Sequence, residues 1–234
     1  MIMGTDVWVR VFDNVQLADD VLLEDFVILG KPTATAAPAE AGTHIAAAAV
    51  IRSHSVIYAG TRVGPGFQCG HHVMIREWTE IGRNVSIGTG SVIEHHVVIH
   101  DGVRLHSNVF VPEFSTLCEG CWLGPNVVLT NARYPLSPRA KEELIGPTVM
   151  PGAKIGANAT VLPGVQVGEQ ALVGAGSVVV RDVPTRAVVV GNPARVVKTI
   201  DELPYAVGEL FSVGDAAGCG PGASRSAANK DGEP

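Results

Sequence analysis

Three side chains that could together handle a proton lie eighteen residues apart: His95, Glu113 and Asn131. An imidazole or a carboxylate within hydrogen-bond reach of an amine can orient the amine and accept its proton. An amide oxygen can fix the nitrogen without titrating. If the chain repeats in space every eighteen residues, these side chains form one column with about 4.8 Å between neighbours. We therefore take them as candidate catalytic residues, provided that the fold supplies this repeat.

The chain does repeat, with a period of six residues. An amphipathic helix has a period of 3.6 residues and drifts off a six-residue frame, so the pattern is not helical. A fixed short period predicts a parallel β-helix, in which three hexads form one triangular coil and the apolar anchors point inward. The unbroken anchors are Ile45, Ile51, Ile57, Val63, Cys69, Ile75, Ile81, Ile87, Ile93, Ile99, Leu105, Val111, Leu117, Leu123 and Leu129.

Upstream, the same spacing continues through Val27, Val21, Val15 and Val9. Eighteen residues separate Val27 from Ile45, so we expect the Pro/Ala-rich stretch GKPTATAAPAEAG to replace one coil without shifting the frame. Histidines at positions 54 and 72 are also eighteen residues apart and should stack on adjacent coils.

Downstream, the frame breaks once. After Leu129 the anchors resume at Val149 and continue at every sixth residue to Val179. The gap predicts a loop inserted over residues 130–148, and long loops that interrupt a regular scaffold are usually functional. Altogether 25 hexads predict an all-β parallel β-helix of about eight coils, a domain over residues 1–199 with a short C-terminal extension. Residues 200–211 are expected to form a closing helix and residues 212–234 a disordered tail.

Composition narrows the classes of function. The formal net charge is −6, which argues against a nucleic-acid binder because such proteins carry a basic face. No apolar stretch approaches the roughly 18 residues of a membrane span, and the N-terminus lacks the pattern of a signal peptide. We expect a cytoplasmic protein that contacts neither nucleic acid nor membrane. Residues 130–200 nevertheless carry eight basic and four acidic side chains, so a polyanionic ligand would be attracted there.

Two segments near the end of the repeat resemble the terminal signature of the acetyl-CoA-dependent hexapeptide-repeat acyltransferases. They are GAGSVVVRDVP, residues 174–184, and VVVGNPARVVK, residues 188–198. The resemblance implies a left-handed β-helix with acetyl-CoA as the acyl donor. It also implies that Gly174, Ala175 and Gly176 border the pantetheine arm, and that Arg195 and Lys198 meet the phosphates of the coenzyme.

A third segment, GPNVVLTNARYP at residues 124–135, resembles the members of this superfamily that N-acetylate nucleotide-linked 3-amino-3-deoxy sugars. By this resemblance Asn131 and Glu113 contact the amine of the sugar, and His95 and His106 occupy polar positions of the active site. One departure is Ala132, where the family often has aspartate after the asparagine.

The resemblance implies a homotrimer with active sites between subunits, acting as an acetyl-CoA-dependent N-acetyltransferase on a nucleotide-linked amino-deoxy sugar. One alternative is O-acetylation of a sugar hydroxyl, which would depend more on a histidine base. A second is a non-catalytic β-helix that binds carbohydrate or serves as a scaffold. No metal is expected, because the zinc-binding histidine triad known in this fold would need a histidine where Ala59 stands.

Overall fold

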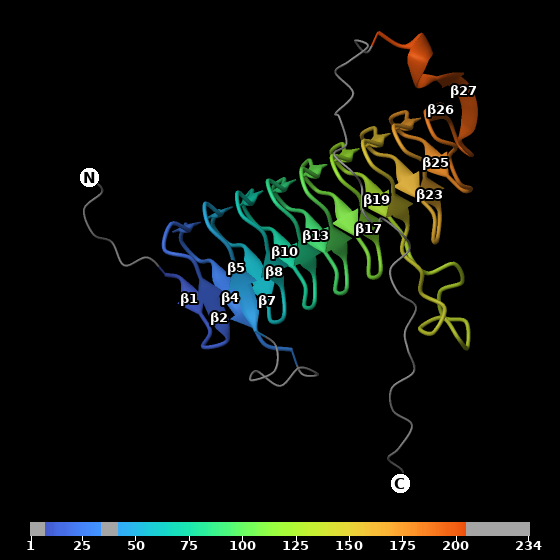
Figure 1. Ribbon diagram of the computed structural model, residues 1–234. Helices are drawn as coiled ribbons and strands as arrows, with labels where there is room; N and C mark the ends of the chain where they lie inside the picture. The colour runs from blue at the N-terminus through green and yellow to red at the C-terminus, as the bar shows by residue number, and fades with distance from the viewer. Residues whose placement is uncertain (1–7, 34–41, 205–234) are drawn as a thin grey trace.

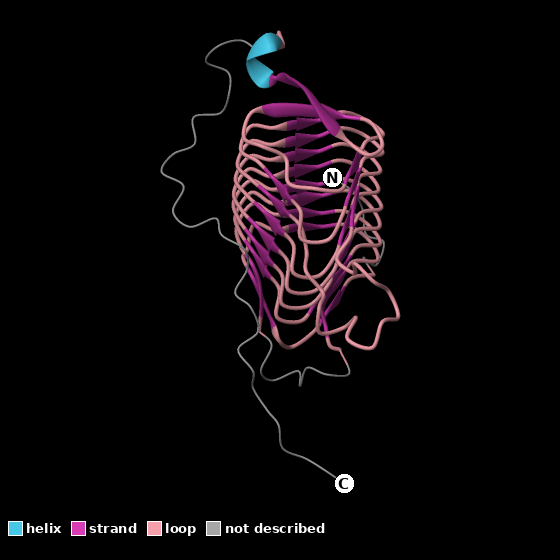
Figure 2. Cartoon of the chain, turned by 90° about the vertical axis from the view of Figure 1, so that its right-hand side faces the viewer, coloured by secondary structure: helices cyan, strands magenta, loops and turns pink. Residues whose placement is uncertain are grey.

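The computed structural model of the chain describes residues 8–33 and 42–204. In these ranges short strands are stacked along one axis, from β1 at one end of the stack to β26 and β27 at the other (Figure 1). Seen from the side, the strands gather into columns separated by loops (Figure 2). The predicted all-β parallel β-helix is confirmed. Within the described ranges no helix has the length and apolar character needed to cross a membrane.

The strands belong to three sheets, which we call sheets A, B and C. Sheet A has the order β1 (Arg10–Val11), β4 (Ile28–Lys31), β7 (Val56–Tyr58), β10 (Met74–Ile75), β13 (Val92–Ile93), β16 (Phe110–Val111), β19 (Val128–Leu129), β22 (Thr160–Val161) and β25 (Val178–Val179). Sheet B has the order β2 (Val15–Leu17), β5 (Thr43–Ile45), β8 (Arg62–Val63), β11 (Glu80–Ile81), β14 (Val98–Ile99), β17 (Thr116–Leu117), β20 (Thr148–Val149) and β23 (Gln166–Val167).

Sheet C closes each coil and extends past the last of them. Its order is β27 (Arg195–Thr199), β26 (Ala187–Val190), β24 (Leu172–Val173), β21 (Lys154–Ile155), β18 (Trp122–Leu123), β15 (Arg104–Leu105), β12 (Ser86–Ile87), β9 (Gln68–Cys69), β6 (Val50–Ile51) and β3 (Leu22–Leu23). The 25 predicted hexads correspond to strands β1–β25. The helix is slightly longer than about eight coils because β26 adds a further parallel strand to β24.

The chain turns from sheet A to B, from B to C and from C to A at three edges, which we call the A–B, B–C and C–A edges. Strands β1–β26 pair in parallel with the strand one coil away, so that Ile75 lies opposite Ile57 and Ile93. Residues eighteen apart therefore stack along the axis. The fifteen anchors from Ile45 to Leu129 are all 5% exposed or less, which confirms the predicted core.

Buried hydroxyl groups at the turns form hydrogen bonds between adjacent coils. At the A–B edge, Thr61 Oγ1 donates to the carbonyl oxygen of Arg76 at 3.2 Å, and Thr79 Oγ1 donates to that of Glu94 at 3.1 Å. Both threonines are fully buried. A buried hydroxyl that satisfies a backbone carbonyl fixes the turn in which the carbonyl lies. The A–B edge is thus held rigidly from coil to coil.

The upstream part of the predicted frame was wrong by two residues. Strand pairing places Leu17 opposite Ile45 and Leu29 opposite Ile57. These partners are 28 residues apart rather than eighteen. The Pro/Ala-rich stretch therefore does not replace a coil: it belongs to a connection at the A–B edge that is ten residues longer than a regular one. Residues 34–41 of that connection lie outside the described ranges.

The predicted loop over residues 130–148 coincides with the second long connection at the A–B edge. It leaves after β19 and returns at β20, and Leu117 pairs with Val149 across the gap. The loop projects away from the stacked coils (Figure 1).

Beyond the last coil the chain reverses direction. Strand β27 pairs antiparallel with β26, and a 3₁₀ helix, η1, spans Ile200–Glu202. Of the closing helix expected over residues 200–211, only this single turn is described; residues 205–211 and the expected tail, 212–234, lie outside the described ranges.

Candidate functional site

The three predicted column residues all lie at the A–B edge, one on each of three consecutive coils. His95 follows β13, Glu113 follows β16 and Asn131 follows β19. His95 Nε2 lies 2.7 Å from Glu113 Oε1, and Asn131 Nδ2 donates to Glu113 Oε2 at 2.9 Å. The side chains of His95 and Glu113 are 23% and 24% exposed. The structure therefore brings the imidazole, the carboxylate and the amide into one hydrogen-bonded column that a ligand can reach.

The orientation of Asn131 gives this column a direction. Its amide nitrogen points to Glu113, so its amide oxygen points away from the carboxylate and can accept from an incoming N–H group. The backbone of Asn131 is fixed as well, because its carbonyl oxygen accepts from the Ile145 amide at 3.0 Å. That bond joins the two ends of the inserted loop. The loop thus begins and closes at the column.

One coil below His95, the column continues with Glu77. Arg76 clamps this carboxylate through two hydrogen bonds, Nε to Oε2 at 2.7 Å and Nη2 to Oε1 at 2.9 Å. Arg76 Nη1 also donates to Glu94 Oε2 at 3.3 Å. Burial is the largest single effect and favours the neutral form of Glu77. The hydrogen bonds from Arg76, a backbone hydrogen bond and the charges of Arg76 and His95 together outweigh it and hold the pKa of the carboxyl below its ordinary value.

Sequence reasoning missed Glu77 and its arginine clamp, although the signal was present. Glu77 stands eighteen residues before His95 and so had to lie in the same column. Glu77 is only 6% exposed, which leaves it little contact with a ligand. We assign it to the support beneath the column, where its negative charge faces His95.

His95 has a second partner on its other ring nitrogen. His95 Nδ1 and His96 Nδ1 are 2.8 Å apart, so one of the two carries the hydrogen and the other accepts it. The ring of Phe114 packs against both imidazoles, at centroid distances of 6.0 Å to His95 and 5.8 Å to His96. These contacts hold the His95 ring between a hydrogen-bond partner on each side.

The fourth predicted catalytic residue, His106, does not join the column. It follows β15 at the C–A edge, where its ring contacts that of Trp122 at a centroid distance of 4.8 Å. Gly174, Ala175 and Gly176 follow β24 at the same edge, near the end of the helix. The candidate residues therefore form two groups, on the two edges that flank sheet A.

The predicted phosphate-binding residues are accessible. Arg195 and Lys198 both lie in β27 and both are exposed. Among the described residues, Arg195 Nη1 donates to the neighbouring carbonyl oxygen of Ala194, at 2.9 Å. A Cβ built on Gly176 would meet no atom within 4 Å, so space lies open beside this residue of the C–A edge. The residues fit a long ligand with anionic groups that follows the end of the helix.

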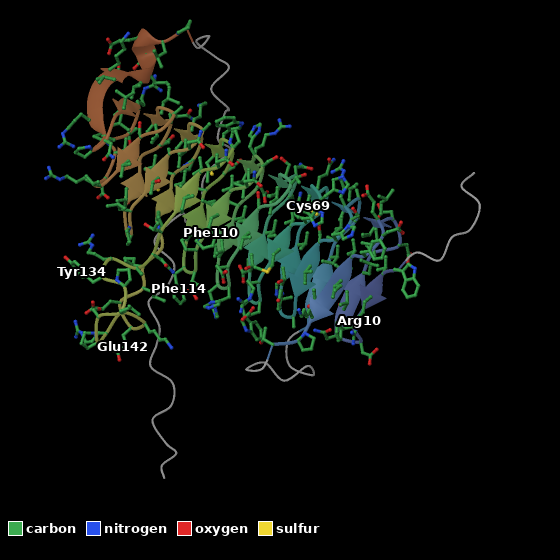
Figure 3. All side chains as sticks on the ribbon, turned by 180° about the vertical axis from the view of Figure 1, so that it is seen from behind. Arg10, Cys69, Phe110, Phe114, Tyr134 and Glu142 are labelled. Atoms are coloured by element: carbon green, nitrogen blue, oxygen red, sulfur yellow. The ribbon has the colours of Figure 1, made fainter. Side chains whose placement is uncertain are left out.

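The inserted loop carries exposed apolar side chains. Tyr134 and Leu136 are 66% and 101% exposed, and Ile145 is 51% exposed. Figure 3 shows Tyr134 and Glu142 on this loop, which stands out from the coils. In the described part of the chain, no cluster of three or more His, Cys, Asp or Glu side chains is arranged to hold a metal ion.

The chain is similar to known transferases over part of its length. Residues 79–113 and 146–181 match the family described as bacterial transferase hexapeptide (six repeats). Among curated proteins, it is 46% identical over 82 residues to the 2,3,4,5-tetrahydropyridine-2,6-dicarboxylate N-acetyltransferase of Alkaliphilus metalliredigens, covering 35% of this chain and 32% of that one.

A second curated relative is the dTDP-3-amino-3,6-dideoxy-alpha-D-galactopyranose 3-N-acetyltransferase of Aneurinibacillus thermoaerophilus. It is 46% identical over 55 residues, which are 23% of this chain and 29% of that one. The chain thus spans less than a third of the length of these two relatives. Among solved structures, the UDP-N-acetylglucosamine acyltransferase of Campylobacter jejuni has a TM-score of 0.68 at 16% identity, covering 82% of this chain and 73% of that one. This likeness establishes a shared fold.

The Arg76–Glu77 contact predicts a pH-dependent stability. Because the pKa of Glu77 is lowered in the folded chain, the pair stabilises the fold above the unfolded pKa of glutamate, about 4.3, and this contribution is lost as the pH falls through the folded pKa. The substitution Arg76→Met leaves a buried carboxylate without its clamp. We expect it to lower the free energy of unfolding by about 1–3 kcal/mol at pH 7 and by less at pH 4, as measured by urea denaturation.

The matched control is the double variant Arg76→Met/Glu77→Gln, which removes the buried charge together with its partner. Its stability at pH 7 should exceed that of Arg76→Met alone. An equal loss at pH 7 and pH 4 for the single variant would show that Arg76 acts through packing rather than through the charge of Glu77.

Proposed function

We propose that this chain, which matches the hexapeptide-repeat family of bacterial transferases over residues 79–113 and 146–181, transfers an acetyl group from acetyl-CoA to the amine of a nucleotide-linked amino-deoxy sugar. The observation that carries the proposal is the column of His95, Glu113 and Asn131. Two features of the relatives support it. Both curated relatives are named as N-acetyltransferases, and one is named for a nucleotide-linked 3-amino sugar.

The column can orient a neutral amine and receive a proton from it. One amine hydrogen bonds to the amide oxygen of Asn131, and a second faces Glu113. The nitrogen lone pair then points away from the column toward the thioester carbonyl carbon. Acetyl-CoA supplies the activated acyl group and a thiolate leaving group. A C–N bond forms as the C–S bond breaks, and the amine proton passes to the Glu113–His95 pair or to the departing thiolate, which leaves as the thiol.

The distribution of the candidate residues favours an active site shared between copies of the chain. The column lies at the A–B edge and the coenzyme residues at the C–A edge. The two groups therefore lie on opposite sides of sheet A within one chain. We propose a homotrimer in which the A–B edge of one copy meets the C–A edge of the next, a heterologous contact that closes into a ring.

Sheet A, between these two edges, has an outer face suited to such a contact. Its outward side chains on paired strands are apolar over six consecutive strands (Figure 3 labels Phe110): Ile28, Val56, Met74, Val92, Phe110 and Val128. The corresponding row on sheet B includes Arg62 and Glu80. An unbroken apolar row of this length is typical of surfaces that are covered in an assembly.

A second candidate reaction is O-acetylation of a sugar hydroxyl. The 2.7 Å contact between Glu113 and His95 favours it, because a hydroxyl bound at Glu113 could pass its proton to the paired carboxylate and imidazole. Asn131 favours the amine, since its amide oxygen is aimed to accept a hydrogen bond that an amine can donate while keeping its lone pair for the thioester. Comparing an amino sugar with its hydroxyl analogue separates the two.

The column predicts the outcome of single substitutions. Asn131→Ala and Glu113→Ala should each lower kcat/KM for the amino sugar by at least about tenfold, or some 1.4 kcal/mol of transition-state stabilisation. His95→Ala should cost less than these if the thiolate takes the proton, and more if the imidazole is the base. The assay is thiol release with a panel of nucleotide-linked amino sugars. His100→Ala, at the B–C edge, serves as the control and should retain wild-type rates. Wild-type rates in all three column variants would exclude the column as the active site.

The charged residues of β27 predict a different kinetic signature. Arg195→Ala or Lys198→Ala should raise the KM for acetyl-CoA but leave the KM for its dephospho form nearly unchanged. The reason is that a charge-assisted contact to the 3′-phosphate, worth about 1.5–3 kcal/mol, is absent when that phosphate is absent. Equal weakening toward both coenzymes would indicate structural damage at β27.

The shared active site can be tested by mixing two inactive variants. Asn131→Ala disables the column, and Ala175→Trp, at an exposed position, blocks the coenzyme edge. If each site combines one edge from each of two copies, refolding an equal mixture restores about a quarter of the sites, because a random trimer pairs two intact edges with that probability. A mixture that remains as inactive as the separate variants would show that both edges act within one chain.

A further inference from the structure

The outer face of sheet C is hollowed into a groove that the proposed reaction has not used. Its volume is about 690 Å³, within the range of small-molecule binding sites. The floor is one outward row on paired strands: Gln68, Ser86, Arg104, Trp122, Lys154 and Leu172. In this row Trp122 lies between the two cations, with Arg104 on one neighbouring strand and Lys154 on the other.

The B–C edge forms one wall of the groove, and its backbone keeps the groove open. Gly102 and Gly120 stand at the same turn position on adjacent coils, with φ of 67° and 62°. A Cβ built on Gly120 would meet nothing within 4 Å, so the space beside it belongs to the groove. Asn84 occupies the same turn position one coil earlier, with φ of 52°. An asparagine is therefore compatible with this backbone, and glycine at the later coils leaves room for a ligand.

The charge of the groove is positive. None of the residues that line it is acidic. Within the described ranges Arg104 forms no ion pair, and its side chain is exposed. Lys154 Nζ donates to the carbonyl oxygen of Gly152 at 3.0 Å, and burial lowers the pKa of its ammonium. Arg104 and Lys154 thus place two cationic groups in one row of the groove.

The groove continues toward the C–A edge. Gln68, Ser86 and Arg104 also line a second hollow of about 380 Å³, which reaches His106. The ring of Trp122 contacts that of His106 edge to face at 4.8 Å. A ligand in the groove would thus extend from the centre of sheet C to the edge that carries the candidate coenzyme residues.

We propose that this groove binds a nucleoside diphosphate, with the base stacked on Trp122 and the phosphates held by Arg104 and Lys154. A flat aromatic surface stacks any nucleobase. The long side chains of Arg104 and Lys154, on the two strands beside Trp122, supply positive charge for the phosphates that extend from the base. The proposal rests on the proposed function, since both substrates of that reaction carry this chemistry. The ligand is then the nucleotide of the sugar substrate or the adenosine phosphate portion of the coenzyme.

Direct binding tests the groove without relying on catalysis. Isothermal titration calorimetry with the full chain would use UDP, GDP and dTDP for the first source, and coenzyme A for the second. Arg104→Gln and Trp122→Ala should each weaken binding of the groove's ligand at least about tenfold, and Trp122→Phe should restore most of the loss because it keeps a stacking surface. Gly120→Asn should weaken binding by filling the groove while removing no contact.

The matched control is Arg62→Gln, which removes one exposed cation from the outer face of sheet B. It should bind like the wild type. Loss confined to the nucleoside diphosphates supports the groove as the site of the sugar nucleotide, and loss confined to coenzyme A supports it as a coenzyme site. If Arg104→Gln, Trp122→Ala and Gly120→Asn all bind every probe like the wild type, the groove is not a nucleotide site, whether or not the chain acetylates an amino sugar.

Discussion

The parallel register between consecutive coils is the constraint on which the rest of this molecule depends. Ile75 lies opposite Ile57 and Ile93 because the inward row admits only apolar side chains. A slip of one residue would turn each of these rows to solvent and each polar row inward. The same register places His95, Glu113 and Asn131 in contact, although they come from three separate coils. The same register therefore determines both the packing of the core and the geometry of the candidate site.

The parallel register also places carboxylates of consecutive coils close together, and neighbouring basic side chains offset the repulsion between them. The A–B edge carries Glu77 and Glu113 in one column and Glu94 beside them. Arg76 binds Glu77 and Glu94, while His95 lies between the two glutamates of the column and contacts Glu113. Each carboxylate thus faces a donor. The consequence is a site in which the carboxylates are offset by neighbouring donors, which suits the binding of a neutral amine.

Much of the fold and part of the site followed from counting residues. Spacing alone predicted the inward anchors, the loop after Leu129, the column, and the stacked rings of His54 and His72, whose centroids lie 4.7 Å apart. The upstream frame failed for a physical reason. Val27 and Leu29 point to the same side of the chain and both are fully buried, so a six-residue period fits either of them. Only backbone pairing decides that Leu29 is the anchor.

The two long connections share one feature: both replace turns at the A–B edge, after β4 and after β19. The other two edges make regular turns from coil to coil, and the ladder regains its register after each interruption. The A–B edge can therefore vary in length, while the other two edges keep the regular spacing of six residues. Selectivity for an acceptor could diverge among relatives through changes in these loops, with no rearrangement of the scaffold that aligns the reacting groups.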